Sequence, residues 1–236
     1  MFFTLIPIFS LILKTQFYSI PIMTIAENVK KIRDSISDNI TLVVAVKYAS
    51  NEQILELVNA GIKDFGFNTY QQLKEVKKLL PSDARVHFIG HLQSNKARKV
   101  LQERVFLIQS VDSYKLAEKI DKVAKELGMG QDILLQVKTD ESKEYGFSAL
   151  EIEGIILKIN NDLKNIGVMG LMTIHPLSEN PEDSRKYFSL MKQLFSNISK
   201  KIDKKLEYLS MGMSNDYKTA IEGGANIVRI GRALFD

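Results

Sequence analysis

The chain has 236 residues, a length that suits one large domain or two small ones. It contains no cysteine, which excludes a disulfide scaffold and thiolate-bound metals, and its three histidines are too scattered in sequence for a zinc motif. The formal net charge is +4, but basic and acidic residues alternate along the chain, which is typical of solvated helix faces and not of a nucleic-acid-binding stripe.

Residues 1–23 are apolar and aromatic, with Lys14 as the only charged side chain. The apolar run over residues 2–13 is too short to span a bilayer, and it lacks a basic start and a clear cleavage site. We therefore prefer an apolar extension or an over-called start to a signal peptide or membrane anchor, with Met23 as the natural beginning. The expected protein is cytoplasmic, has no membrane partner, and folds over residues 24–236.

Apolar residues at helical spacing predict a first helix over residues 25–36. A β-branched run over residues 41–46 then predicts a strand buried on both faces. The next segment, residues 50–60, is predicted to be a helix that Ser50 or Asn51 caps and that Gly61 ends at the C′ position.

This alternation repeats to the end of the chain. Further strands are predicted over residues 64–67, 85–89, 105–109, 132–137, 167–173, 206–209 and 226–230. Further helices are predicted over residues 70–80, 94–101, 113–127, 149–160, 181–202 and 215–223. Eight strands with a helix in every gap favour an α/β fold of one closed (β/α)8 TIM barrel with an extra N-terminal helix. An open doubly wound sheet is the alternative, but no G-x-G-x-x-G follows the first strand.

Two strand-to-helix turns near the C-terminus are candidates for a phosphate cradle. Residues 210–214 (Ser-Met-Gly-Met-Ser) follow the seventh predicted strand, and Gly231 and Arg232 follow the eighth. Unpaired backbone N–H groups at helix starts attract anions, and barrels often bind phosphate after strands 7 and 8. Ordinary βα turns, in which Gly and Ser are common, are the alternative.

Lys47 directly follows the first predicted strand. We expect a lysine there to be partly desolvated, which would lower its pKa and leave more neutral amine to attack a carbonyl. A surface lysine is the alternative. A nucleophilic lysine that faces a phosphate cradle suits a phosphorylated aldehyde, either pyridoxal 5′-phosphate (PLP) or the substrate of a Schiff-base aldolase.

Arg229 lies in the last predicted strand, where alternation directs its side chain toward the barrel mouth. An arginine there can donate a hydrogen bond to a pyridine nitrogen and, because it keeps its proton, would leave that nitrogen unprotonated. A structural ion pair inside the barrel is the alternative for this residue.

Four stretches together closely resemble the pyridoxal-phosphate homeostasis protein family, single-domain relatives of the alanine racemase barrel. They are residues 86–96 (VHFIGHLQSNK), 170–174 (GLMTI), 209–214 (LSMGMS) and 228–231 (VRIG). The resemblance extends over residues 24–236. It implies a fold-type III PLP barrel in which Lys47 holds the cofactor as an internal aldimine, a Schiff base.

The resemblance also implies the other contacts of the cofactor. The phosphate would be held by Ser210, Gly212 and Ser214 and by backbone N–H groups at Gly231 and Arg232. Arg229 would face the pyridine nitrogen, Asn68 would lie beside the cofactor, and Met211 would pack near it.

The chain departs from the family pattern at three places. No serine precedes Lys47, and the loop over residues 67–72 (FNTYQQ) lacks the usual glutamate, arginine and second acid. His175 stands where proline is common, and we expect a loop histidine without a special role in preference to a new functional group.

Three functions remain open at this point. Racemisation requires two positioned bases, and relatives that racemise amino acids carry a further β domain, whereas this chain ends five residues after Gly231. We therefore expect a PLP carrier in intracellular PLP homeostasis, without robust catalysis, that serves PLP-dependent apoenzymes as a monomer or weak dimer. The alternatives are an amino-acid racemase that uses Tyr48 or Tyr145 as the opposite base and, third, a Schiff-base aldolase.

Overall fold

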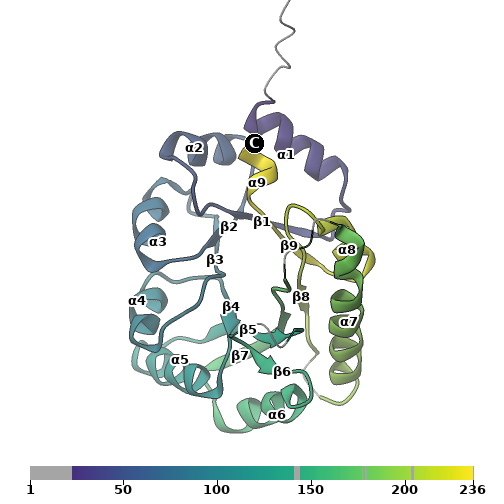
Figure 1. Cartoon of the computed structure of the whole chain (residues 1–236). Coiled ribbons are helices and arrows are strands. Elements are labelled where there is room, and N and C mark those ends of the chain that lie inside the picture. Colours follow the sequence, from purple (N-terminus) through teal and green to yellow (C-terminus); the bar gives the residue numbers. More distant parts are fainter. Residues whose placement is uncertain (1–22, 141–143, 177, 179, 203–204, 236) are drawn as a thin grey trace, which may run out of the picture.

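The computed structural model describes residues 23–140, 144–176, 178, 180–202 and 205–235. Its described residues form a closed barrel of parallel strands inside a ring of helices (Figure 1). The barrel strands are β1 (Thr41–Ala45), β2 (Asp64–Phe67), β3 (Arg85–Phe88), β4 (Leu107–Val111), β5 (Gln131–Lys138), β7 (Ile166–Met172), β8 (Tyr208–Ser210) and β9 (Ile227–Ile230). The predicted (β/α)8 barrel is thereby confirmed.

The strand register shows how the barrel closes. Each strand pairs in parallel with the next one along the chain, and β9 returns to β1, where Val43 is in register with Arg229. The remaining strand, β6 (Phe147–Ser148), was not predicted; it pairs with the end of β5, beyond the residues of β5 that pair with β7. Because all barrel strands run the same way, their C-terminal ends meet at one face.

Two strands are displaced by about two residues from the prediction. The structure places β4 at Leu107–Val111 instead of residues 105–109, and β8 at Tyr208–Ser210 instead of residues 206–209. The prediction ended the first of these strands at Gln109 and the second at Leu209. Ser110 and Ser210 nevertheless continue the strands as buried polar residues, because each has a hydrogen-bond partner inside the fold.

The helices follow the predicted alternation with altered bounds. They are α1 (Ile25–Asp34), α2 (Asn51–Asn59), α3 (Tyr70–Val76), α4 (Ala97–Gln102), α5 (Tyr114–Glu126), α6 (Ile152–Asp162), α7 (Arg185–Ser199), α8 (Tyr217–Glu222) and α9 (Arg232–Phe235), with short 3₁₀ turns η1 (Lys77–Leu79), η2 (Ser94–Lys96) and η3 (Pro181–Ser184). Ser50 is confirmed as the N-cap of α2, and Gly61 follows at φ +78°, as a C′ residue does.

The predicted lead-in helix α1 begins with a capping box between Thr24 and Glu27. Its buried face packs beside α2 and α9 (Figure 1), and the Asn28 side chain donates a hydrogen bond of 3.3 Å to the carbonyl of Leu234 in α9. The extra helix therefore holds the C-terminal end of the chain against the barrel.

The core has two layers. An outer layer of apolar side chains lies between strands and helices, and a smaller cluster inside the barrel includes Val43, Leu134 and Met172. Within the described ranges, no helix has both the length and the apolar character needed to cross a membrane. Apart from Met23, the predicted extension over residues 1–23 lies outside the described residues, and the domain boundary stays a prediction.

Candidate functional site

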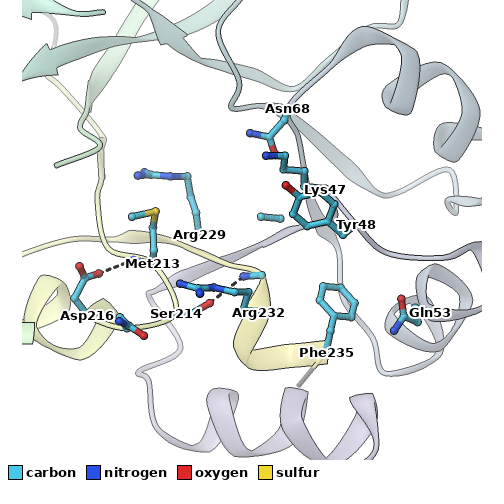
Figure 2. Close-up of a pocket in the computed structure, with 13 residues that line it drawn as sticks. Lys47, Tyr48, Gln53, Asn68, Met213, Ser214, Asp216, Arg229, Arg232 and Phe235 are labelled. Atoms are coloured by element: carbon cyan, nitrogen blue, oxygen red, sulfur yellow. Dashed lines mark hydrogen bonds between the residues drawn. The ribbon is translucent and has the colours of Figure 1, made fainter. Parts of the chain in front are cut away.

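A cavity of about 400 Å³ opens at the C-terminal ends of β1, β2 and β9, beside the turn after β8 (Figure 2). Side chains or backbone from six of the nine predicted site residues line it: Lys47, Asn68, Ser214, Arg229, Gly231 and Arg232. The barrel thus gathers residues that are up to 185 positions apart in sequence, from Lys47 to Arg232, around one space.

Lys47 projects into this cavity beside Asn68 and Tyr48 (Figure 2). Its Nζ lies 4.8 Å from the centroid of the Tyr48 ring, in cation–π range. The expectation that Lys47 is desolvated is wrong, because its side chain is exposed. Two contacts fix the segment before it: the N–H of Val46 donates to Gly66 of β2, and the side chain of Gln72 donates to the carbonyl of Val46.

The Gln72 contact bears on the loop over residues 67–72, which lacks the polar residues usual in its place. Thr69 caps α3 by accepting a hydrogen bond of 3.3 Å from the backbone of Gln72. The cap sets the start of α3, from which the Gln72 side chain reaches the end of β1. The loop therefore still has a structural role, which is to hold the segment that carries the cavity lysine.

Arg229 reaches the opposite side of the cavity from β9, as strand alternation predicted (Figure 2). Its side chain is buried, and its two terminal nitrogens donate to the hydroxyl of Ser210 and, over 2.7 Å, to the carbonyl of Thr173. Burial lowers the pKa of Arg229 to about 10, and Asp216 opposes that shift. The guanidinium therefore stays charged at neutral pH, and the described residues form no ion pair with it, contrary to the structural alternative.

Backbone N–H groups converge at the turn between β9 and α9. The N–H groups of Gly231 and Ala233 both lie 3.3 Å from the hydroxyl oxygen of Ser214, to which they donate. The helix after this turn, α9, has only four residues and so contributes no long helix dipole, and both N–H groups are already engaged by Ser214. Arg232 adds an exposed cationic side chain to the same wall.

Ser210, Met211 and Gly212 are not among the residues that line the cavity. The hydroxyl of Ser210 is buried and bonded to Arg229 and Gln109, and Met211 packs in the outer core layer. Gly212 has φ +91°, and a Cβ there would lie 2.5 Å from the Cβ of Ala220. Gly212 thus allows the turn to pass close to α8, and a direct cofactor contact of these three residues stays a prediction.

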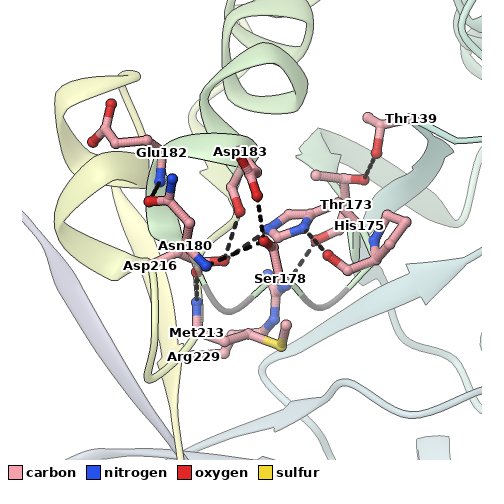
Figure 3. A network of polar contacts seen from close by, with 12 residues as sticks. Thr139, Thr173, His175, Ser178, Asn180, Glu182, Asp183, Met213, Asp216 and Arg229 are labelled. Atoms are coloured by element: carbon pink, nitrogen blue, oxygen red, sulfur yellow. Dashed lines mark hydrogen bonds and ion pairs between the residues drawn. The ribbon is translucent and has the colours of Figure 1, made fainter.

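Asp216 is the main residue of the site that the sequence did not single out (Figure 3). Its buried carboxylate accepts a hydrogen bond of 2.8 Å from the backbone of Met213 and one of 3.3 Å from Ser184. Burial opposes ionisation of Asp216, but the contacts with His175, Met213 and Ser184 together hold its pKa below the ordinary value. Asp216 therefore fixes the turn after β8 to the start of α7.

His175 is the partner of this carboxylate. Its Nε2 lies 2.9 Å from Oδ2 of Asp216, outside hydrogen-bond alignment, and its Nδ1 lies 2.7 Å from the carbonyl of Pro176. The ring stacks on Tyr187, with centroids 5.3 Å apart. The expectation of a loop histidine without a special role is wrong in structural terms, because the side chain is buried and connects β7 to the turn after β8.

Of the two tyrosines proposed as the second base of a racemase, Tyr48 lies at the cavity and Tyr145 does not. Tyr48 lines the cavity and is 83% exposed. Tyr145 is not among the lining residues; it stacks on His91, with centroids 4.0 Å apart, and a hydrogen bond with Glu144 raises its pKa. A raised pKa makes the Tyr145 hydroxyl a weaker source of phenolate base.

Comparisons with known proteins agree with this geometry. The family described as alanine racemase, N-terminal domain, matches residues 20–236. A pyridoxal phosphate homeostasis protein of Aquifex aeolicus is 41% identical over 195 residues, which cover 82% of this chain and 85% of that protein. The human protein of the same name is 32% identical over 210 residues, with coverage of 82% and 75%.

Solved structures also resemble this chain. PipY of Synechococcus elongatus with PLP bound superposes with a TM-score of 0.81 at 32% identity, covering 90% of this chain and 100% of that one. An alanine racemase of Clostridium difficile shares the fold, with a TM-score of 0.75 at 16% identity over 90% of this chain and 59% of that one.

Proposed function

The chain belongs to the pyridoxal phosphate homeostasis proteins, which share the fold of the alanine racemase N-terminal domain, and from that premise we propose that it binds PLP covalently and reversibly. Lys47 is the residue that takes up the cofactor. The protein holds PLP and releases it to other proteins, and it does not turn over amino acids robustly.

One observation carries this proposal: Lys47 and Arg229 line the same cavity from opposite sides, and Ser214, Gly231 and Arg232 line it as well (Figure 2). PLP offers an aldehyde, a pyridine nitrogen and a phosphate, and each meets a matching group. The amine of Lys47 suits the aldehyde, and the donors of Arg229 suit the ring nitrogen. The backbone N–H groups of Gly231 and Arg232 and the hydroxyl of Ser214 suit the phosphate.

The residues then have separate tasks. Lys47 would hold the cofactor reversibly through its aldehyde, with water as the other product, and hydrolysis would release it. Bound PLP supplies an electron-accepting ring, which Arg229 weakens because a guanidinium does not give its proton to the pyridine nitrogen. Asn68 lies beside Lys47 and orients the bound group. Ser210, Gly212 and Met211 support the site from outside the lining.

A carrier is favoured over a racemase by the side chains around Lys47. Racemisation needs a second positioned base on the other face of the reacting carbon. Tyr48, the tyrosine that lines the described cavity, is 83% exposed, so water reaches its hydroxyl. The names of the relatives also support the carrier. PLP-dependent apoenzymes as acceptors, a monomer or weak dimer, and a cytoplasmic location belong to the same proposal.

The test is a PLP titration of the purified full chain, followed by absorption and then by transfer to a PLP-dependent apoenzyme. The account predicts saturable binding, recovery of apoenzyme activity, and no amino-acid racemisation. Lys47→Ala abolishes the covalent absorption band, whereas Lys63→Ala, which changes an exposed lysine outside the cavity paired with Asp83, does not. Racemisation that Lys47→Ala abolishes would overturn the carrier in favour of the racemase.

A further inference from the structure

A row of buried polar side chains runs through the barrel interior from the cavity. Ser210 donates to Gln109 over 2.6 Å, Gln109 lies 3.0 Å from His87, and His87 lies 2.9 Å from Asp64. Arg229 contacts the first member, Ser210, at the cavity end. All five side chains are at least nine-tenths buried.

The chemistry of the groups fixes the direction of every bond. The guanidinium of Arg229 can only donate, so the Ser210 oxygen accepts, and the one hydroxyl hydrogen of Ser210 goes to Oε1 of Gln109. The amide nitrogen of Gln109 then donates to Nδ1 of His87, which leaves Nε2–H to donate to Asp64. One directed chain therefore leads from a cation to a carboxylate.

The histidine in the middle must be neutral for this chain to form. A protonated ring would present N–H at both nitrogens and could not accept from Gln109. Burial lowers the pKa of His87, against the opposing effect of Asp64, which agrees with a neutral ring. The far end is anchored by Arg85, which donates to Asp64 over 2.6 Å. Asp64 and Arg85 are the first residues of β2 and β3, so the chain ends toward the N-terminal face of the barrel.

The buried guanidinium of Arg229 needs fixed hydrogen-bond partners to hold its long side chain in one position. Its side chain is long, and a buried charge without fixed partners costs several kcal/mol. Within the described part of the chain it has two acceptors, Ser210 and the carbonyl of Thr173, and only the first continues to a carboxylate. The carboxylate whose charge acts on Arg229 is Asp216. The hydrogen-bond chain instead fixes the orientation of the Ser210 hydroxyl that accepts from the guanidinium, because every bond in it has one direction.

We propose that Ser210, Gln109 and His87 are positioning residues, which hold the Arg229 guanidinium toward the cofactor by a directed hydrogen-bond chain to Asp64. This inference rests on the proposed function and deepens it. It also gives Ser210 a role other than the predicted phosphate contact: its hydroxyl oxygen and hydrogen are both engaged in the chain.

The first experiment uses the full chain without cofactor. Side-chain ¹⁵N NMR is expected to show His87 as the Nε2–H tautomer and the Arg229 guanidinium protons in slow exchange with water. Gln109→Leu raises that exchange rate by roughly tenfold or more. Gln131→Leu is the matched control. Gln131 is also buried, at the start of β5, but its side chain donates to the carbonyls of Val105 and Asp132, which are not part of the hydrogen-bond chain. Unchanged Arg229 exchange in Gln109→Leu would overturn the proposal.

The second experiment compares PLP with pyridoxal, which lacks the phosphate. Ser210→Ala and Gln109→Leu should each weaken binding of both compounds by the same factor, roughly 10- to 100-fold, while Gln131→Leu changes it by less than about twofold. Adding Gln109→Leu to Arg229→Gln should weaken binding no further, because the chain acts through Arg229. A loss confined to PLP in Ser210→Ala would instead make Ser210 a phosphate ligand and overturn its role in the chain.

The two experiments separate the two proposals. If the wild-type protein fails to bind PLP, the proposed function fails. The exchange rates of the Arg229 guanidinium protons then still decide whether the hydrogen-bond chain positions the guanidinium. If PLP binds at Lys47 but the variants behave like Gln131→Leu, the function stands and the positioning chain is wrong. Ser210→Ala removes a single oxygen and so serves as the second variant where Gln109→Leu does not fold.

Discussion

Replacing Asp216 by alanine should loosen the turn after β8 and destabilise the whole domain. The carboxylate holds three groups at once: the backbone N–H of Met213, the hydroxyl of Ser184 and the ring of His175. Alanine leaves all three without that partner in a region where Asp216 itself is only 4% exposed.

The size of the effect follows from the burial of the Asp216 carboxylate. A buried donor left without its acceptor typically costs about 1–3 kcal/mol, and Met213 and Ser184 supply two such donors, so we expect a loss of about 2–6 kcal/mol. For a domain of this size that loss lowers the melting temperature by roughly 4–24 °C. Asp216→Asn keeps an oxygen for Met213 but loses the charge, so we expect a smaller loss of about 1–3 kcal/mol.

Urea denaturation of the wild type and both variants at pH 7 measures these differences. Asp34→Ala is the control, since Asp34 forms an exposed ion pair with Lys30 that is worth about 0–1 kcal/mol. The pKa of Asp216 is depressed, so its stabilisation is present above the unfolded value of about 3.9 and is lost as the pH falls through the folded value. A loss in Asp216→Ala no larger than in Asp34→Ala would refute the reasoning.

Three further predictions concern other parts of the fold. Because burial keeps His87 neutral in the folded protein, protonation of this histidine in the unfolded protein should lower the free energy of unfolding by up to about 1.4 kcal/mol per pH unit below about pH 6.5. A His87→Gln variant with the same slope in pH-dependent denaturation would contradict this. Gly212→Ala forces a side chain to φ +91° and against α8 and should cost more than about 1 kcal/mol, whereas Gly154→Ala, in α6 with open space at its Cβ, should be neutral or stabilising in thermal unfolding. Gln72→Ala releases the end of β1 and should weaken PLP binding by roughly 5- to 10-fold in a fluorescence titration without loss of secondary structure; unchanged affinity would show that the contact is dispensable.

The barrel was predictable because its signals are local. Each strand is a short apolar run and each helix an apolar stripe, and parallel pairing follows from their alternation. The α2 caps, Ser50 and Gly61, were predictable for the same reason. The ends of β4 and β8 were not, because Ser110 and Ser210 look like loop residues until the fold provides their hydrogen-bond partners.

The candidate site was predictable where position along a strand decides the direction of a side chain. Lys47 and Arg229 follow from their places at the ends of β1 and β9. The exposure of Lys47 agrees with the alternative of a surface lysine, because lysine is mostly exposed in folded proteins. The sequence did not single out Asp216, and His175 was expected to have no special role. Each residue matters through its contact with the other, and 41 positions separate them in sequence.

Borohydride reduction of the PLP-loaded full chain, followed by peptide mass mapping, tests whether Lys47 holds the cofactor. We expect one stable adduct of the reduced cofactor, on the peptide that contains Lys47, and no adduct in Lys47→Ala. An adduct on another lysine with Lys47 unmodified, or no adduct at saturating PLP, would rule out Lys47 as the site.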